Sequence, residues 1–308
     1  MWLDKVLPGT VKDETAASYR YVIDHYVLPH IGTVPVAKLT PDHVDSMLTS
    51  LRKAGLSVRT QRYARAVLRR ALSHAERRGV VTRNVAALVD GPKGGGRKLD
   101  DAPTASEARA ILAAAKGDRL EAFAVLALTL GLRRGELLGL QWSDLDLDAK
   151  QLTVNRTLHY TAGRGLRVGS PKTRGSARTI PLPDRCVAAL AQHRVRQAEE
   201  RLKAGGSWRE SAHVFTSPIG TPLDPRNALR WWHGVTEKAG VGRRRIHAAR
   251  HTAATVMLEQ GAPLEVVSAV LGHASLAITA DVYAKPAADA KRRALTAVSD
   301  SYDESATA

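Results

Sequence analysis

The 308-residue sequence is poor in cysteine and in long apolar runs. Cys186 is its single cysteine, which excludes a disulfide scaffold and a cysteine-rich zinc site. We expect this side chain to be a small buried apolar group. The longest apolar run, residues 121–130, has about half of the length that a bilayer-spanning helix requires. Because the N-terminus also lacks a signal-peptide pattern, we expect a soluble, cytosolic protein.

The common signatures of nucleotide-binding and metal-dependent enzymes are missing as well. The sequence contains no glycine-rich loop of the P-loop type, no GxGxxG and no HExxH. Asp144, Asp146 and Asp148 alternate along the chain, but the glycine and the glutamate of a calcium loop do not accompany them. We therefore expect neither a metal site nor a cofactor.

Acidic residues are scarce relative to basic ones. Thirty acidic side chains stand against 46 basic ones, which gives a formal net charge of +16, and 33 of the basic residues are arginine. Guanidinium groups bind phosphate oxygens in pairs, so a polyanion such as nucleic acid is the simplest partner. Membranes, acidic proteins and ribosomes also attract basic proteins, so charge alone leaves the partner open.

A glycine-rich segment divides the chain. Residues 91–100 contain Pro92 and three consecutive glycines, a composition typical of a linker. The sequence therefore predicts a helical domain over residues 1–90 and a second domain over residues 101–308, mainly helical with a small antiparallel sheet. A tail from about residue 287 to residue 308 either forms a short helix or stays mobile.

Three helices are expected in the first domain. The first covers residues 15–28 and is ended by Pro29 and Gly32. The second follows a start signal at Thr40, and the third is capped by Ser57 and reaches about residue 78. An apolar stripe at helical spacing, residues 64–75, gives the third helix a core-facing side. Another side of this helix carries four arginines: Arg59, Arg62, Arg65 and Arg69. They either contact phosphates or form a solvated basic face.

The second domain mixes helical segments with two segments of strand character. Alternation predicts strands over residues 151–158 and 178–182, and the glycines at 163, 165 and 169 indicate turns between them. A buried helix over residues 120–130 is expected to end at Gly131. The other helices are expected over residues 106–115, 188–204, 227–238, 247–260 and 264–271.

Arginine, lysine, histidine and tyrosine form a coherent set for metal-free phosphoryl transfer. Arginines neutralise the charge that develops on the non-bridging oxygens. A tyrosine can be the nucleophile, and a lysine or histidine can protonate the departing alkoxide. Four local motifs carry these residue types, and each also has an ordinary structural interpretation.

Two of these motifs lie in the first half of the second domain. Arg133 follows the glycine-marked helix end in TLGLRRGE, where its charge could simply stabilise a helix C-terminus. Lys172 lies in the basic turn SPKTR between the two predicted strands. That turn could be a solvated hairpin tip, or a mobile carrier that brings a lysine to a leaving group.

The other two motifs lie near the C-terminus. In HAARHTAAT, His247 and Arg250 are three residues apart on one helical face. A surface pair of cations there would be unfavourable without an anion, which favours an anion site. In LGHASLAITADVY, Tyr283 follows His273 by ten residues, although a lone tyrosine is more often a packing group.

Taken in order, these motifs resemble those of the tyrosine recombinases of the phage integrase family, from about Tyr19 to Tyr283. The resemblance implies six catalytic residues: Arg133, Lys172, His247, Arg250, His273 and Tyr283. It also implies a supporting acid at Glu136. The chain departs from the family at Ala249, where leucine is common, and we interpret this as a tolerated packing change.

The resemblance also implies a role for each residue. Tyr283 would attack the scissile phosphate, giving a 3′-phosphotyrosyl link and a free 5′-hydroxyl. The two arginines would hold the non-bridging oxygens, and Lys172 would protonate the 5′-oxygen. His247 would act near the tyrosine as proton acceptor or phosphate donor, and His273 would hydrogen-bond the phosphate. Glu136 would orient an arginine.

Partners and alternatives follow from the same resemblance. A helical, SAM-like core-binding domain and a catalytic domain would form a C-shaped clamp on duplex DNA attachment sites, and four protomers would act in the synaptic complex without ATP or metal. A directionality factor is a further candidate partner, and the cytoplasm of a bacterial cell, at the nucleoid, is the expected location. Family members often carry an additional arm-binding domain; this chain either lacks it naturally or is part of a longer protein.

An integrase of a phage or mobile element fits the motifs better than the alternatives do. A resolution recombinase of the Xer type has a similar length. A catalytically silent DNA-binding protein on the same scaffold is disfavoured by the intact six-residue set. A type IB topoisomerase shares the chemistry but acts without synapsis.

Overall fold

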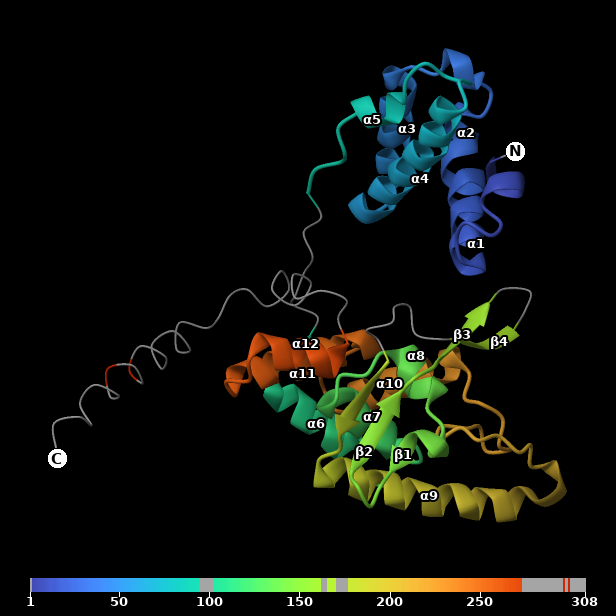
Figure 1. Cartoon of the computed structure of the whole chain (residues 1–308). Helices are drawn as coiled ribbons and strands as arrows, with labels where there is room; N and C mark the ends of the chain where they lie inside the picture. Colours follow the sequence, from blue (N-terminus) through green and yellow to red (C-terminus); the bar gives the residue numbers. More distant parts are fainter. Residues whose placement is uncertain are drawn as a thin grey trace. The chain divides into compact units, whose positions relative to one another are not determined.

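The computed structural model describes residues 2–94, 102–161, 165–169 and 177–272, together with the isolated positions 296 and 299. The chain separates into two compact units, Met1–Lys98 and Leu99–Ala308. Helices dominate both units, and the second also contains small antiparallel sheets, which confirms the predicted fold class (Figure 1). Within the described ranges, no helix combines the length and the apolar character needed to cross a membrane.

The first unit is a small helical bundle. Its helices are α1 (Asp13–Val22), α2 (Leu28–Ile31), α3 (Pro41–Lys53), α4 (Val58–Arg77) and α5 (Val85–Leu88). Single π-helical turns occupy Trp2–Val6 and Ile23–Val27, and a 3-10 turn occupies Val36–Lys38. The predicted apolar stripe of α4 is confirmed, because Ala64, Val67, Leu68 and Leu72 are buried in one cluster with residues of α3 and α5.

Helix starts in this unit were predictable, whereas one helix end was not. Thr40 and Ser57 cap α3 and α4, and the hydroxyl of Ser57 accepts from the backbone N–H of Thr60 at 3.1 Å. Of the two predicted stops, Gly32 is confirmed as the C-cap of α2, whereas Pro29 does not end the helical path, which runs on to Ile31. A π-helical turn precedes α2, and Pro29 then falls in the first turn of a new helix, where its missing N–H removes no necessary bond.

The second unit is built mainly of helices, with α7 at its centre. They are α6 (Ala105–Ala115), α7 (Glu121–Thr129), α8 (Arg134–Gly139), α9 (Asp184–Ala204), α10 (Pro225–Lys238), α11 (Ile246–Glu259) and α12 (Leu264–Leu271). Short 3-10 turns occupy Trp142–Asp144 and Gly205–Ser207. Helix α7 is buried on every side from Ala122 to Leu128, because α6, α8, α9 and α11 all pack against it (Figure 1). Cys186 of α9 is fully buried, as predicted, and burial raises the pKa of its thiol to about 11.

Five short strands form two separate sheets. Strands β1 (Leu145–Asp146), β2 (Gln151–Val154) and β5 (Arg178–Pro181) form an antiparallel sheet in the order β1-β2-β5. Strands β3 (Thr157–Thr161) and β4 (Gly165–Gly169) pair antiparallel with each other.

Two strand predictions were wrong. The segment predicted as one strand over residues 151–158 is divided between the two sheets, because the chain leaves the first sheet after Val154. Arg156, at the break, forms an ion pair with Asp144 at 3.0 Å. The glycine-marked turn region contains β4, since pairing along all of β3 supplies the backbone hydrogen bonds of Gly165–Gly169.

Candidate active site

A left-handed turn at Gly131 positions the first catalytic candidate. Gly131 has φ +62°, and a Cβ atom there would lie 2.7 Å from Cδ2 of Leu271 and 3.2 Å from Cβ of Ala253. Glycine therefore supplies both the backbone conformation and the close approach of α11 and α12. The chain then enters α8 directly, with Arg133 as its N-cap.

The ordinary structural interpretation, in which Arg133 stabilises the C-terminus of α7, is wrong. Helix α7 ends before Leu130, and Arg133 lies at the N-terminus of α8, where the helix dipole disfavours a cation. Glu136 compensates for this placement. Its Oε2 accepts from the backbone N–H of Arg133 at 2.9 Å, and its Oε1 accepts from Nη1 of Arg133 at 2.7 Å.

A second guanidinium binds the same carboxylate. Nη1 and Nη2 of Arg178, the first residue of β5, donate to Oε1 and Oε2 of Glu136 at 3.3 and 3.2 Å. The side chains are 8% and 1% exposed, respectively. Burial alone would raise the pKa of Glu136, but the hydrogen bonds and charges of Arg178 and Arg133 outweigh it and lower this pKa below its usual value. The carboxylate is therefore ionised and bound on both oxygens.

Arg250 of α11 lies inside the protein rather than on its surface. The residue is 2% exposed, and its Nη1 and Nη2 donate to the carbonyl oxygens of Gly131 at 2.9 Å and Leu271 at 2.6 Å. The interpretation as a surface pair of cations is therefore wrong. His247, one turn earlier in α11, is exposed, and its ring lies edge-on to that of His251 with centroids 5.1 Å apart.

The C-terminal end of α12 binds all three guanidinium groups. The carbonyl oxygens of three consecutive residues, 270 to 272, each accept a hydrogen bond from a different arginine. The donors are Nε of Arg178 to residue 270 at 2.6 Å, Nη2 of Arg250 to residue 271 at 2.6 Å, and Nη2 of Arg133 to residue 272 at 3.0 Å. A helix C-terminus has unpaired carbonyls and partial negative charge, which suits such donors.

Among the described residues, this cluster carries a positive charge. Three arginines are opposed there by one carboxylate, Glu136, and by the partial charge of a helix end of roughly half an electron. Arg133 is also the most exposed of the three, with 37% of its side chain accessible. Among the described residues the arrangement therefore forms a partly open, preorganised anion site.

Three predicted catalytic residues, Lys172, His273 and Tyr283, lie outside the described residues. Lys172 belongs to the segment between β4 and β5. His273 directly follows Gly272 in the chain, so it is bonded to the residue whose carbonyl binds Arg133.

The four predicted DNA-binding arginines all lie on α4 of the first unit. Arg59, Arg62 and Arg69 are exposed and Arg65 is half-buried. Two of them bind the segment that leaves this unit. Nε and Nη2 of Arg62 donate to the carbonyl oxygens of residues 92 and 94 at 2.8 and 2.9 Å, and Arg65 donates to that of residue 89.

Arg178 is the member of the cluster that sequence reasoning missed. The sequence places it only at the start of a strand, and its partners lie 42 and 92 residues away along the chain. One signal pointed to it: Glu136 is an acid in an apolar segment and needs more than one cationic partner when it is buried.

Comparisons with known proteins identify the family of the chain. Models of the phage integrase family and of the phage integrase central domain match residues 103–289 and 1–92. A tyrosine recombinase XerC-like protein of Caldanaerobacter subterraneus is 40% identical over 64% of this chain. The match spans about half (53%) of that relative's own length. An integrase of Streptomyces ambofaciens is 34% identical, with 92% of this chain and 74% of the relative covered.

Solved structures show the same fold. The Tn1549 transposon integrase in complex with transposon right end DNA has a TM-score of 0.79 at 20% identity, over 94% of this chain and 95% of that one. A lambda integrase tetramer bound to a Holliday junction has a TM-score of 0.68 at 20% identity, over 91% and 74% of the two chains. The chain therefore belongs to the phage integrase family of tyrosine recombinases.

Proposed function

We propose that this protein is a site-specific DNA recombinase, an integrase that inserts or excises a phage or mobile element. The observation that carries the proposal is the convergence of Arg133, Arg178 and Arg250 on the C-terminal end of α12. Among the described residues, Glu136 is the one carboxylate that opposes their charge. A phosphodiester is an anion of suitable charge for such a site, and its two non-bridging oxygens suit two guanidinium groups.

The proposed reaction exchanges one phosphate ester for another. The phenol oxygen of Tyr283 attacks the phosphorus, the bond to the 5′-oxygen breaks, and a 3′-phosphotyrosyl link forms. Arg133 and Arg250 stabilise the charge on the non-bridging oxygens. Lys172 gives a proton to the departing 5′-oxygen, while His247 accepts the phenol proton or binds the phosphate.

Positioning supports these assignments for the described residues. Arg250 is held by two carbonyl groups and Arg133 by a carboxylate and a carbonyl, so neither has to be ordered when a phosphate arrives. Glu136 is the orienting group of Arg133. His273 is proposed to bind the phosphate because it extends from the carbonyl end to which all three arginines are bound.

Partners follow from the solved relatives. One is bound to transposon DNA and another forms a tetramer on a Holliday junction. We therefore propose duplex attachment sites as the substrate and four copies in the synaptic complex. From the family resemblance alone, we also propose a directionality factor as an accessory partner. Arg59, Arg62, Arg65 and Arg69 of α4 are proposed to contact the DNA backbone.

One experiment tests the proposed function. A DNA site is first selected from a random pool by binding to the whole chain, and a nicked version of it serves as a suicide substrate. The wild-type protein should form a covalent adduct that survives on a denaturing gel, and Tyr283→Phe should form none while it binds DNA normally. Tyr302→Phe, a second tyrosine of the C-terminal segment, is the matched control and should form the adduct.

The outcomes separate the alternatives. Selected DNA that is bound but never cleaved by the wild-type protein would favour the silent DNA-binding alternative. The XerC-like relative favours a second candidate, a resolution recombinase of the Xer type. If the element's own attachment sites are exchanged less efficiently than directly repeated sites on one circle, the integrase assignment is wrong and resolution replaces it.

A further inference from the structure

The guanidinium of Arg178 is fully engaged inside the protein. Nε donates to the carbonyl oxygen of Val270, and Nη1 and Nη2 donate to the two oxygens of Glu136. With 8% of the side chain exposed, all three guanidinium nitrogens of Arg178 donate to protein groups. These contacts suit an arginine that acts through the groups that it holds.

Those groups are the supports of the phosphate-binding arginine. Glu136 binds both the backbone and the side chain of Arg133, and the carbonyl of Gly272 binds its Nη2. Arg178 fixes the carboxylate from one side and the end of α12 from the other. It thus closes a ring of hydrogen bonds in which Arg133 is the outermost, most exposed member.

The backbone of α12 is shaped around Arg178. Gly272 has φ +65°, and a Cβ atom there would lie 2.7 Å from Nη1 and 3.0 Å from Cζ of Arg178. Any other residue would displace the guanidinium or the turn. The close packing of Gly272 against Arg178 ties the C-terminal end of α12 to β5.

We propose that Arg178 is a positioning residue of the recombination site: it holds the carboxylate of Glu136 where this group orients Arg133, and it fixes the C-terminal end of α12. The inference rests on the proposed function. Without Arg178, the buried carboxylate of Glu136 would lose one of the two cations that contact it among the described residues, and Arg133 would lose a fixed support.

The proposal predicts a pH signature. The charged groups that act on Glu136 are Arg178 from β5 and Arg133 from the N-cap of α8, while Arg250 of α11 binds neighbouring carbonyls. Removing Arg178 removes the largest influence that lowers the pKa of Glu136 and leaves burial, which raises it. Glu136 then takes up a proton at higher pH, and cleavage at acidic pH falls further than in the wild-type protein.

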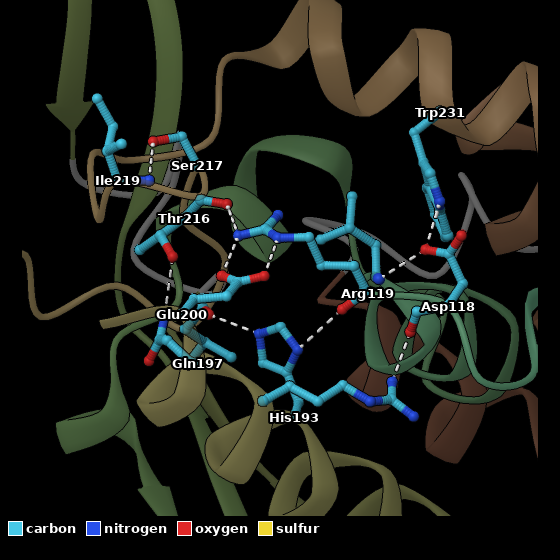
Figure 2. Close-up of polar contacts among 12 residues, drawn as sticks. Asp118, Arg119, His193, Gln197, Glu200, Thr216, Ser217, Ile219 and Trp231 are labelled. Carbon is cyan, nitrogen blue, oxygen red and sulfur yellow. Dashed lines mark hydrogen bonds and ion pairs between the residues drawn. The ribbon is translucent and has the colours of Figure 1, made fainter. Parts of the chain in front are cut away.

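A matched control exists in the same unit. Arg119 also donates to both oxygens of a glutamate, Glu200 of α9, and to one carbonyl, that of Thr216 at 2.7 Å (Figure 2). This ion pair is partly buried, with the arginine 26% and the glutamate 20% exposed. It shares no residue with the Arg133 cluster, so Arg119→Gln removes an equivalent set of bonds away from the proposed site.

The test compares cleavage rates of the full chain on the selected suicide substrate across about pH 5 to 9. We expect Arg178→Gln to cleave roughly 10- to 100-fold more slowly. The acidic limb of its pH–rate profile, where cleavage falls with falling pH, should move to higher pH. Half-site affinity and its salt dependence should be unchanged. In a double variant that also carries Glu136→Gln, the pH–rate profile should no longer shift. This result separates a shift caused by Glu136 from one caused by His247 or His273. Arg119→Gln should keep the wild-type rate and limb.

Each outcome decides the matter. Equal cleavage rates and equal pH–rate profiles for Arg178→Gln and Arg119→Gln would overturn the inference. A weaker salt dependence of DNA binding by Arg178→Gln would make Arg178 a DNA contact. If Arg178→Gln does not fold, Arg178→Lys replaces it: a slowed rate with a wild-type limb supports positioning, and a full rate overturns it. No adduct from the wild-type protein would instead overturn the proposed function, and this inference with it.

Discussion

Arg133 is bound by Glu136 through both its backbone and its side chain. The backbone N–H donates at 2.9 Å and Nη1 at 2.7 Å, so the same carboxylate caps α8 and orients the guanidinium. Helix start and active-site geometry thus depend on one buried acid. A change at residue 136 is expected to alter both stability and catalysis.

The first prediction concerns stability against pH. The pKa of Glu136 is lower in the folded protein than its usual value of about 4.3. A depressed folded pKa means that the ionised form stabilises the protein above the unfolded pKa, and that this stabilisation is lost as the pH falls through the folded pKa. Glu136→Gln should therefore be destabilised by about 1–3 kcal/mol at neutral pH, and the difference should shrink in acid.

Denaturant unfolding of both proteins at neutral and acidic pH measures this difference. Glu265→Gln removes an exposed acid at the start of α12 and serves as the control, with little expected effect at either pH. A constant difference between the wild type and Glu136→Gln at all pH values would contradict the prediction.

Much of the site could be predicted because its motifs are local. The glycine before Arg133, the acid three residues after it and the spacing of His247 and Arg250 are visible in the sequence, and the structure brings Arg133, Glu136 and Arg250 together around α12. Arg178 could not be found in this way. Its importance comes from tertiary contacts between a strand, a helix start and a helix end, which no local period encodes.

The strand error has a similar cause. Apolar and polar side chains alternate over residues 151–158 because they alternate in each of two consecutive strands. No residue in this pattern indicates where the chain passes from one sheet to the other. Glycine at both ends of β4 indicated a turn, although pairing with β3 decides the conformation. Helix boundaries fared better, as α12 begins and ends at the predicted residues.

The second prediction concerns the turn that delivers Arg133. Gly131→Ala places a methyl group 2.7 Å from Leu271 in a left-handed conformation, so it should cost about 1–2 kcal/mol for the backbone and about 1–3 kcal/mol for overpacking. Gly117→Ala is the matched control, because Gly117 has φ +77° but no atom within 4 Å of the added methyl group. Thermal unfolding of the two variants isolates the packing contribution, and equal losses would contradict the close approach of α12.

The third prediction distinguishes the arginines of α4. Arg62 and Arg65 donate to carbonyls of residues 89–94, whereas the side chains of Arg59 and Arg69 are exposed and make no hydrogen bond within the described part of the first unit. Replacing Arg59 and Arg69 by alanine should flatten the dependence of log K on log salt by up to about 0.9 per phosphate contact.

Replacing Arg62 and Arg65 instead should change the slope less, because their guanidinium groups already hold the exit of the chain from this unit. Equilibrium binding to the selected half-site over a salt series measures both slopes. Equal changes for the two double variants would mean that the bonds to residues 89–94 are released on DNA. An unchanged slope for both would leave α4 with a solvated basic face.

The fourth prediction concerns the leaving group. If Lys172 protonates the 5′-oxygen, Lys172→Ala should lower the cleavage rate by about 10²–10⁴-fold. A substrate with a 5′-bridging sulfur needs no proton, because a thiolate leaves far more readily than an alkoxide. The variant should therefore recover much of the lost rate on the phosphorothiolate, while the wild type gains little.

Arg174→Ala, in the same basic segment between β4 and β5, is the control, because a guanidinium keeps its proton and cannot give it to a leaving group. Sulfur cannot replace a lost phosphate contact, so any defect of Arg174→Ala should be equal on the two substrates. Single-turnover cleavage of both substrates by both variants gives four rates. Because a phosphate contact and a proton donor differ only in their response to the leaving group, equal ratios for Lys172→Ala and Arg174→Ala would assign Lys172 to phosphate binding, and the proton would have to come from another residue.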